Sequence, residues 1–441
     1  MGAGVSRAAW RLLGALSCGL AGCALVSPPD ALPASTAGPG VVSAPPGPLL
    51  AGAARVDVTP TDTACLGGFG LWRRSEGVHD PIWARALALR RGELSAVIVA
   101  VDVVGLHHHF VERVRARLRA RVPPEAVLVA ATHNHEGPDT MGLWGLPPFL
   151  SGIDGDYLPV LEDGVVAAAS AALDALGPAT GRWAQAQAPS EGVSRNKRQP
   201  DLIDRTVTVL ALDRPDGAPV ATLVHFACHP EVLGSKNRLI TADFPAATVA
   251  TVESGRGGGV AVYLNGALGG MVTADQRAHT FAEAERIGTA VGRVALEALH
   301  DARPLPSAVD LVAARKPLEV PIQNRTYHLL SGLGLLGGRP FSGGATPSEM
   351  AALRLGPLLL LTVPGEALPR VGFELEALWG LEPFCLVGLG NDELGYLIHE
   401  EDWPAERYRY ERTVSPGPLT TTLLRRAAGE LVGAVAPVST R

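Results

Sequence analysis

The chain has 441 residues, and 47% of them are hydrophobic, so it can bury a sizeable core as one large domain or two ordinary ones. Its formal net charge is −6, and its 38 lysines and arginines are spread along the chain. Nucleic-acid-binding proteins concentrate basic residues on one face, so this spread excludes nucleic acid as a partner.

The N-terminal segment indicates an exported lipoprotein. Two arginines give it a positive start, and the apolar run at residues 12–20 is too short to span a bilayer. Leu20-Ala21-Gly22-Cys23 then places small residues before a cysteine. We therefore expect residues 1–23 to be a lipoprotein signal peptide, with lipid attached to Cys23. A myristoylation pattern at Gly2 is the alternative, but it leaves the apolar run unexplained.

Residues 24–49 are rich in Pro, Ala, Ser and Gly and cannot bury much apolar surface. A flexible tether is predicted there, and it would hold an exported protein at the cell envelope, on the periplasmic side or at the cell surface. Membrane attachment through Cys23 is expected, and no protein partner is inferred. The other mature cysteines are odd in number and widely spaced, which favours buried thiols over disulfides.

Apolar, β-branched runs alternate with segments of helical periodicity along the rest of the chain. The predicted strands cover residues 96–104, 126–131, 206–212, 220–228, 260–264, 358–363 and 385–389. The predicted helices cover residues 110–122, 157–176, 282–300, 367–378 and 419–432. This order predicts an α/β fold of mixed β-sheets flanked by helices, in a single domain over residues 50–441. The Gly-rich residues 330–344 predict a long, mobile loop.

Two histidines, His133 and His135, directly follow one of the predicted buried strands. In an extended chain, positions i and i+2 share a face, and α/β enzymes place their sites at the carboxyl ends of strands. One imidazole could bind a metal while the other is a second ligand or a hydrogen-bonding group. Polar histidines at a strand end, without a metal, are the alternative.

Two further strand ends carry residues of the metal-ligand type. His229 follows the strand at 220–228, and Pro230 frees it from the strand ladder. Glu366 follows the turn Val363-Pro364-Gly365. Taken singly, His229 could be a histidine in a turn, and Glu366 is better explained as an acid at a helix N-terminus. With His133 they supply two imidazoles and one carboxylate, the three-ligand shell with one open position of catalytic zinc.

Four blocks in this order resemble the neutral (non-lysosomal) ceramidase family. They are Ala131–Pro138 (the family's ATHxHxGP), Phe226–Pro230 (FAxHP), Val363–Glu366 (VPGE) and Gly388–Glu411, which holds elements like GLxNxxxxY and YE. The resemblance covers about residues 53–435. It implies one metallohydrolase domain that cleaves the N-acyl amide bond of ceramide or another lipid or small-molecule amide.

The resemblance also implies roles for individual residues. It makes His133, His229, Glu366 and Tyr396 the Zn²⁺ ligands and assigns His135 to the substrate or the oxyanion. Protonation of the departing amine would then fall to His135 or Tyr410.

A basic group is implied in Arg195-Asn196-Lys197-Arg198. Arg198 is the expected member and Arg195 its rival, because the register is ambiguous. A solvated basic loop is the alternative.

The chain departs from the family in two places. The family's serine-bearing loop corresponds to Asn265–Met271, which has no hydroxyl, so a covalent serine mechanism is not expected there. An immunoglobulin-like C-terminal domain is also expected to be missing. These departures keep two alternatives open: a zinc hydrolase of a non-ceramide amide or ester, and a non-catalytic lipoprotein with a vestigial metal site.

Three smaller features complete the prediction. Gly67–Gly70 is expected to be a structural turn. His107–His109 is expected to be an exposed polar cap, because three consecutive helical residues share no face. Asp243 could either orient a zinc-bound histidine or cap a helix.

Overall fold

The computed structural model describes residue 32 and residues 37–146 and 150–437. The predicted signal peptide, with Cys23, lies outside these residues. Within them, no helix has both the length and the apolar character that crossing a membrane requires.

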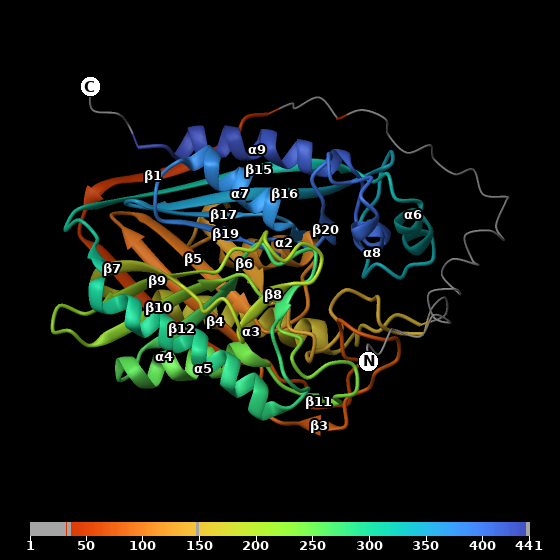
Figure 1. The fold of residues 1–441 in the computed structure, drawn as a ribbon. Coiled ribbons are helices and arrows are strands. Elements are labelled where there is room, and N and C mark those ends of the chain that lie inside the picture. The colour runs from red at the N-terminus through yellow and green to blue at the C-terminus, as the bar shows by residue number, and fades with distance from the viewer. Residues whose placement is uncertain (1–31, 33–36, 147–149, 438–441) are drawn as a thin grey trace.

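Two β-sheets lie face to face between two layers of helices, and Figure 1 shows these four layers. The smaller sheet has the order β1 (Gly40–Gly47), β15 (Val309–Pro321), β16 (Ala345–Leu355), β17 (Leu358–Thr362), β19 (Phe384–Val387). The larger sheet has the order β12 (Val260–Asn265), β10 (Pro219–Phe226), β9 (Thr206–Asp213), β7 (Gly177–Gln187), β2 (Leu49–Asp57), β4 (Trp83–Arg91), β5 (Leu94–Val101), β6 (Val127–Ala131), with β14 (Arg303–Pro304) paired to β7.

Three short strand pairs lie outside these sheets. They are β3 (Gly77–Val78) with β11 (Leu239–Ile240), β8 (Ser194–Asn196) with β13 (Val272–Ala274), and β18 (Glu366–Ala367) with β20 (Tyr396–Leu397). The last pair matters most for function, because it is parallel and places Glu366 opposite Tyr396.

Helices cover the outer face of each sheet. Over the larger sheet lie α3 (Tyr157–Asp174), α4 (Phe244–Arg256) and α5 (Phe281–Ala298), and over the smaller sheet lie α7 (Pro369–Trp379) and α9 (Leu419–Val435). The remaining helices are α2 (His108–Leu118), α6 (Arg325–Gly332), α8 (Arg409–Thr413), and the 3₁₀ turns η1 (Pro124–Ala126), η2 (Leu299–Asp301) and η3 (Glu406–Tyr408).

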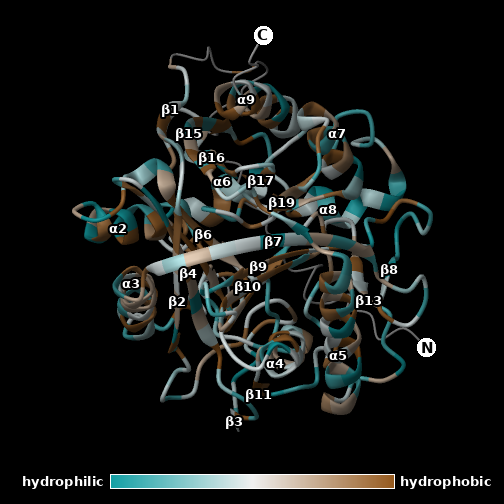
Figure 2. Ribbon diagram, turned by 90° about the vertical axis from the view of Figure 1, so that its left-hand side faces the viewer, coloured by the Kyte–Doolittle hydropathy of each residue, from teal (hydrophilic) through white to brown (hydrophobic). Residues whose placement is uncertain are grey.

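The sequence explains why each of these helices buries only the face that packs against its sheet. In α5 the buried residues recur at helical spacing, as at Ile287, Val291 and Ala295. Thr280 begins this helix by accepting a hydrogen bond from the Glu283 amide. In Figure 2 the hydrophobic colour gathers on strands in the middle of the molecule. Inner-face residues of both sheets belong to one hydrophobic cluster, so the sheets share a core.

The larger sheet curls until its two ends meet, and this closure builds the site. The side chain of Asn265, at the end of β12, donates to the carbonyl of Thr132, just after β6, at 2.9 Å. It also bonds Cys228, just after β10, donating to its carbonyl at 2.9 Å and accepting from its amide at 3.0 Å. The segments that follow β6 and β10 are therefore tied to one side chain.

The α/β fold of mixed sheets and flanking helices is confirmed, and each predicted strand and helix overlaps an observed one. Two expectations need correction. Residues 40–47, placed in the tether, form β1, an edge strand paired with β15 that tolerates Pro45 and Pro46. The predicted mobile loop at 330–344 begins inside α6 and then buries Leu335, Leu336 and Arg339.

Candidate active site

His133 is held on a turn that follows β6, not on the strand itself. Its backbone is left-handed, with φ of 67°. Its Nδ1 lies 2.7 Å from the carbonyl oxygen of Val104. A carbonyl can only accept, so Nδ1 carries the proton and Nε2 presents a lone pair toward the interior.

His229 is fixed in the same way after β10. Its Nδ1 donates to the carbonyl of Val272 at 2.8 Å, and its own amide donates to that carbonyl at 2.9 Å. The ring is therefore anchored at the same backbone oxygen as its main chain. Its Nε2 faces inward, 3.0 Å from Glu366 Oε2.

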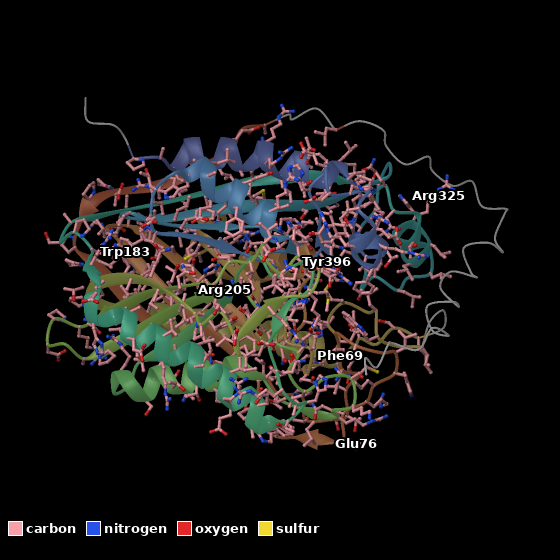
Figure 3. All side chains as sticks on the ribbon, viewed as in Figure 1. Phe69, Glu76, Trp183, Arg205, Arg325 and Tyr396 are labelled. Atoms are coloured by element: carbon pink, nitrogen blue, oxygen red, sulfur yellow. The ribbon has the colours of Figure 1, made fainter. Side chains whose placement is uncertain are left out.

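Glu366 and Tyr396 arrive together from the layer of the smaller sheet. They are register partners in the β18–β20 pair, and the Glu366 amide donates to the carbonyl of Gly395. Both side chains are buried. The Tyr396 hydroxyl lies 3.8 Å from Met271 Sδ, and Figure 3 shows Tyr396 between the two layers.

The predicted residues converge. Glu366 Oε2 lies 3.5 Å from His133 Nε2 and 3.0 Å from His229 Nε2. His135 Nε2 lies 3.2 Å from His133 Nε2, and ligand atoms of the three histidines all lie within 4.8 Å of one another.

The donor set fits a divalent cation. Nε2 of both His133 and His229 is a lone-pair atom, and both face the carboxylate oxygen of Glu366, which is also an acceptor. A proton on Nε2 of one imidazole would satisfy only the contact between that imidazole and Glu366. A cation among the three groups satisfies both, and neutral imidazoles with a carboxylate are ligands that Zn²⁺ takes.

The charges of the site are mutually dependent. Burial raises the pKa of the Glu366 carboxyl, but His133 and His229 lower it more, so the carboxylate stays ionised. Burial lowers the pKa of His229, yet its hydrogen bond to Glu366 reverses the direction. Burial, then His133 and His229, hold the pKa of His135 well below its ordinary value. Burial, then Glu366, raises the pKa of Tyr396.

The loop at Gly67–Gly70, which was predicted to be only a structural turn, packs against His135. Gly68, at φ of 87°, lies so close that a Cβ there would be 2.2 Å from His135 Cγ. Phe69 meets the His135 ring edge-on, with centroids 4.9 Å apart. Arg73 donates to the carbonyl of His135 and pairs with the buried Glu136 at 2.9 Å. This loop therefore belongs to the wall of the site.

The other predicted residues lie farther out. Arg198 is half-buried, and its Nε lies 2.6 Å from Glu411 Oε1, next to Tyr410 in sequence. Its rival Arg195 is about half exposed and faces Asp275 at 3.4 Å. Tyr410 is partly exposed, and its ring centroid lies 5.9 Å from that of Tyr396.

The loop at Asn265–Met271 lies beside Glu366 and Tyr396. Gly269 approaches so closely that a Cβ there would be 2.3 Å from the carbonyl oxygen of Glu366. Met271 is held at φ of 63° with its sulfur near Tyr396. The position matched to the family's serine is Gly269, which has no side chain, so the loop offers no hydroxyl nucleophile there.

The exposed cap predicted at His107–His109 is wrong. His107 is buried against the carbonyl of Met141 and the guanidinium of Arg339. His108 faces Glu349 at 3.2 Å and, with Glu112, forms a second group of metal-ligand type. Arg115 and Arg315 already neutralise Glu349, so this second group is an ion-pair network.

For Asp243, the capping alternative is correct. Its side chain accepts from the Phe244 amide at 2.6 Å, at the start of α4. Backbone carbonyls, not Asp243, orient the two histidines described above.

Sequence reasoning missed Glu231 and Asn265. Glu231 faces His135 Nδ1 at 3.8 Å, and Asn265 ties β12 to the segments after β6 and β10. Glu231 stands directly after the His229-Pro230 pair, which was the available signal. Asn265 begins the loop matched to the family's serine-bearing loop, but no local pattern reveals its bonding role, because its partners come from distant segments.

Comparison with known proteins agrees with the motifs. Residues 49–261 match the family model of neutral/alkaline non-lysosomal ceramidases, N-terminal. The neutral ceramidase of Pseudomonas aeruginosa is 25% identical over 217 residues, which are 44% of this chain and 32% of that protein. The match thus spans about a third of the relative's length.

Solved structures agree on the fold. The crystal structure of neutral ceramidase from Pseudomonas aeruginosa superposes with a TM-score of 0.73 at 20% identity, over 89% of this chain and 76% of that one. A ceramidase complexed with C2 gives a TM-score of 0.73 at 20% identity, over 88% and 75% of the two chains. Through residues 49–261, the chain is similar to the neutral/alkaline non-lysosomal ceramidases, in their N-terminal part.

Proposed function

We propose that this protein is a zinc-dependent hydrolase of an N-acyl amide bond, with ceramide as the substrate class. The observation that carries the proposal is the meeting of His133, His229 and Glu366 around one point, with acceptor atoms facing each other. Tyr396 stands beside Glu366 as the fourth proposed ligand. The family match and the structural likeness support an amide as the bond that is cleaved.

Hydrolysis adds a water oxygen to the carbonyl carbon, breaks the C–N bond and moves a proton to the departing amine. Bound Zn²⁺ would supply Lewis acidity and a lowered water pKa. Glu366 and the two anchored imidazoles hold their positions through backbone hydrogen bonds, so little reorganisation is needed. Arg198, held by Glu411, is the cation proposed to stabilise the developing oxyanion. His135 or Tyr410 would donate the proton to the amine nitrogen.

A lipid anchor on Cys23 is part of the proposal. It would keep the enzyme at the membrane that holds its substrate, on the periplasmic side of the cell envelope or at the cell surface. Labelling with a fatty-acid precursor, with Cys23→Ala as the unlabelled comparison, checks this part separately.

One observation keeps a second candidate function open. Gly269 stands where the family loop carries its serine, and Met271 places its sulfur 3.8 Å from the Tyr396 hydroxyl, so the wall that a substrate would meet is altered. A zinc hydrolase of a non-ceramide amide or ester is therefore the alternative.

The test compares metal content and turnover in matched variants. Protein purified without chelator should hold about one zinc per chain and hydrolyse fluorogenic ceramide. His133→Ala should lose the zinc and at least about a hundredfold in kcat. His300→Ala, which removes an exposed histidine outside the site, should change neither.

The outcomes separate the candidates. Turnover of short N-acyl amides or esters without turnover of ceramide would show that the substrate is a non-ceramide amide or ester. Zinc without hydrolysis of any of these would indicate a vestigial site. Absence of zinc in wild-type protein that still hydrolyses amides would overturn the mechanism.

A further inference from the structure

The three histidines of the site differ in the hydrogen-bond partner of Nδ1, the ring nitrogen that points away from the centre of the site. His133 and His229 each donate from Nδ1 to a backbone carbonyl, at 2.7 and 2.8 Å. His135 Nδ1 is buried and, among the described residues, has no hydrogen-bond partner. A buried imidazole nitrogen without a partner is costly, so the group nearest to it needs an explanation.

That group is the carboxylate of Glu231. Its Oε2 lies 3.8 Å from His135 Nδ1, and its side chain is only 8% exposed. The other oxygen, Oε1, accepts from Thr273 Oγ1 at 2.5 Å and lies 3.8 Å from Lys197 Nζ. The Glu231 amide donates to the carbonyl of His229 at 3.1 Å. One oxygen is thus held in place, and the second is left to face His135.

The ring of His135 has little room to turn away. Gly68 lies against its Cβ, Cγ and Nδ1 edge, and Phe69 contacts the ring edge-on. Its Nε2 faces His133 Nε2 at 3.2 Å. The ring therefore has one nitrogen toward the zinc ligands and the other toward the carboxylate.

We propose that Glu231 is a positioning residue, which accepts a hydrogen bond from Nδ1–H of His135 and so turns the Nε2 lone pair toward the metal centre. A carboxylate behind a histidine is a common device for fixing the tautomer at a metal site. The reverse tautomer would set the Nδ1 lone pair against the carboxylate. It would also point Nε2–H at His133 Nε2, whose lone pair the proposed zinc uses.

The proposed tautomer of His135 decides between the two candidate proton donors, and this step rests on the proposed function. With Nε2 unprotonated, the one ring N–H of neutral His135 is at Nδ1, beside Glu231, so Nε2 has no proton to give to the departing amine. Tyr410, whose ring lies 5.9 Å from that of Tyr396, is then the proton donor. His135 instead adds a third imidazole acceptor to the centre.

The test reads the tautomer directly. In protein labelled with ¹⁵N-histidine and purified without chelator, long-range ¹H–¹⁵N spectra should show His135 protonated at Nδ1. Glu231→Leu removes the acceptor and should shift His135 toward the Nε2–H form. Glu231→Gln keeps an acceptor oxygen and should retain Nδ1–H. Glu191→Gln, an exposed acid, should leave the spectrum unchanged.

Kinetics provide the second readout. Glu231→Leu should lower kcat by about tenfold to a hundredfold, with KM within about twofold, and Glu231→Gln should recover most of the loss. Nε2–H in the wild-type spectrum, or an unchanged tautomer in Glu231→Leu, would overturn the proposal. The spectra need no substrate, so they decide the role of Glu231 even if no amide is hydrolysed.

Discussion

His133 reaches the site through a backbone conformation that only a few per cent of non-glycine residues adopt, with φ of 67°. Met271, whose sulfur lies near the Tyr396 hydroxyl, has φ of 63°. Strained residues persist where the surrounding structure fixes them, and these two are fixed at the proposed metal centre. The i and i+2 spacing correctly placed His133 and His135 together, but the reason was wrong. Strand β6 ends at Ala131, and a left-handed turn brings the two rings together.

The contact of Gly68 with His135 leads to a first prediction. Gly68→Ala would place a methyl group 2.2 Å from His135 Cγ at a residue with φ of 87°, so the loop or the ring must move. We expect kcat to fall by about tenfold to a hundredfold, because small misplacements at a site are costly. Gly70→Ala is the matched control, since its Cβ would meet nothing within 4 Å. Equal kcat values for the two variants would show that this loop does not position His135.

Asn265 supports a second prediction at the residue scale. Asn265→Leu would leave the carbonyls of Thr132 and Cys228 and the Cys228 amide without their buried partner. We expect the free energy of unfolding to fall by about 3 kcal/mol, measured by urea denaturation. Gln185→Leu, which loses one side-chain bond to Thr208 on the same sheet, should cost at most about 1 kcal/mol. Similar losses in both variants would contradict the role of Asn265.

At the scale of elements, the sequence predicted strands that are continuous apolar runs, such as β5, in which every residue is buried. It missed β4, although that strand is nearly as buried. The reason is its arginines: Arg85 pairs with Glu253 at 2.6 Å, and Arg91 donates to the carbonyls of Pro45 and Pro48. Partners from distant segments make these charges acceptable inside a sheet, and a local pattern does not contain them.

The residues of the site also fall into two groups, those that the sequence could identify and those that it could not. The proposed ligands follow strand ends within short motifs, so the sequence could name them. Glu231, Asn265 and Gly68 act through contacts between segments that are far apart in the chain. Their roles follow from closure of the curled sheet and from loop packing, which no spacing rule specifies.

The network that joins α2 to β15 and β16 gives a third prediction. Glu349 is buried, and Arg115 and Arg315 contact it from α2 and β15. Burial raises the pKa of Glu349, but these arginines lower it far more, so the net direction is below the ordinary value of 4.5. The folded-state pKa is depressed, so this stabilisation is present above pH 4.5 and is lost as pH falls below it.

Glu349→Gln should therefore cost about 3 kcal/mol near pH 7, because the buried Arg115 and the partly buried Arg315 lose their buried carboxylate and keep only the more exposed Glu112. The difference from wild type should shrink as the pH of the urea titration falls below 4.5. Glu162→Gln, which removes the partner of two largely exposed arginines, should cost at most about 1 kcal/mol. A Glu349→Gln deficit that does not change with pH would contradict the assigned pKa direction.

For the whole molecule, the proposed metal centre connects the two sheets. His133 and His229 follow strands of the larger sheet, whereas Glu366 follows β17 of the smaller one. The smaller sheet also contacts the larger one directly near the site, where the Gly388 amide bonds the carbonyl of Asn265. A cation held by ligands from both layers would resist their separation.

Removal of the metal should therefore lower global stability, not only activity. A ligand that binds only the folded state at a hundredfold excess over its Kd adds about 2.7 kcal/mol. For a chain of this size that corresponds to a rise of about 2 to 5 °C in Tm. Scanning calorimetry should show this fall after chelation and its recovery with Zn²⁺. Glu366→Gln removes the carboxylate among the proposed ligands from the layer of the smaller sheet, so its Tm should respond much less to either treatment. If the Tm of the wild type changes with neither chelator nor zinc, the proposed ligands lie close together without binding an ion.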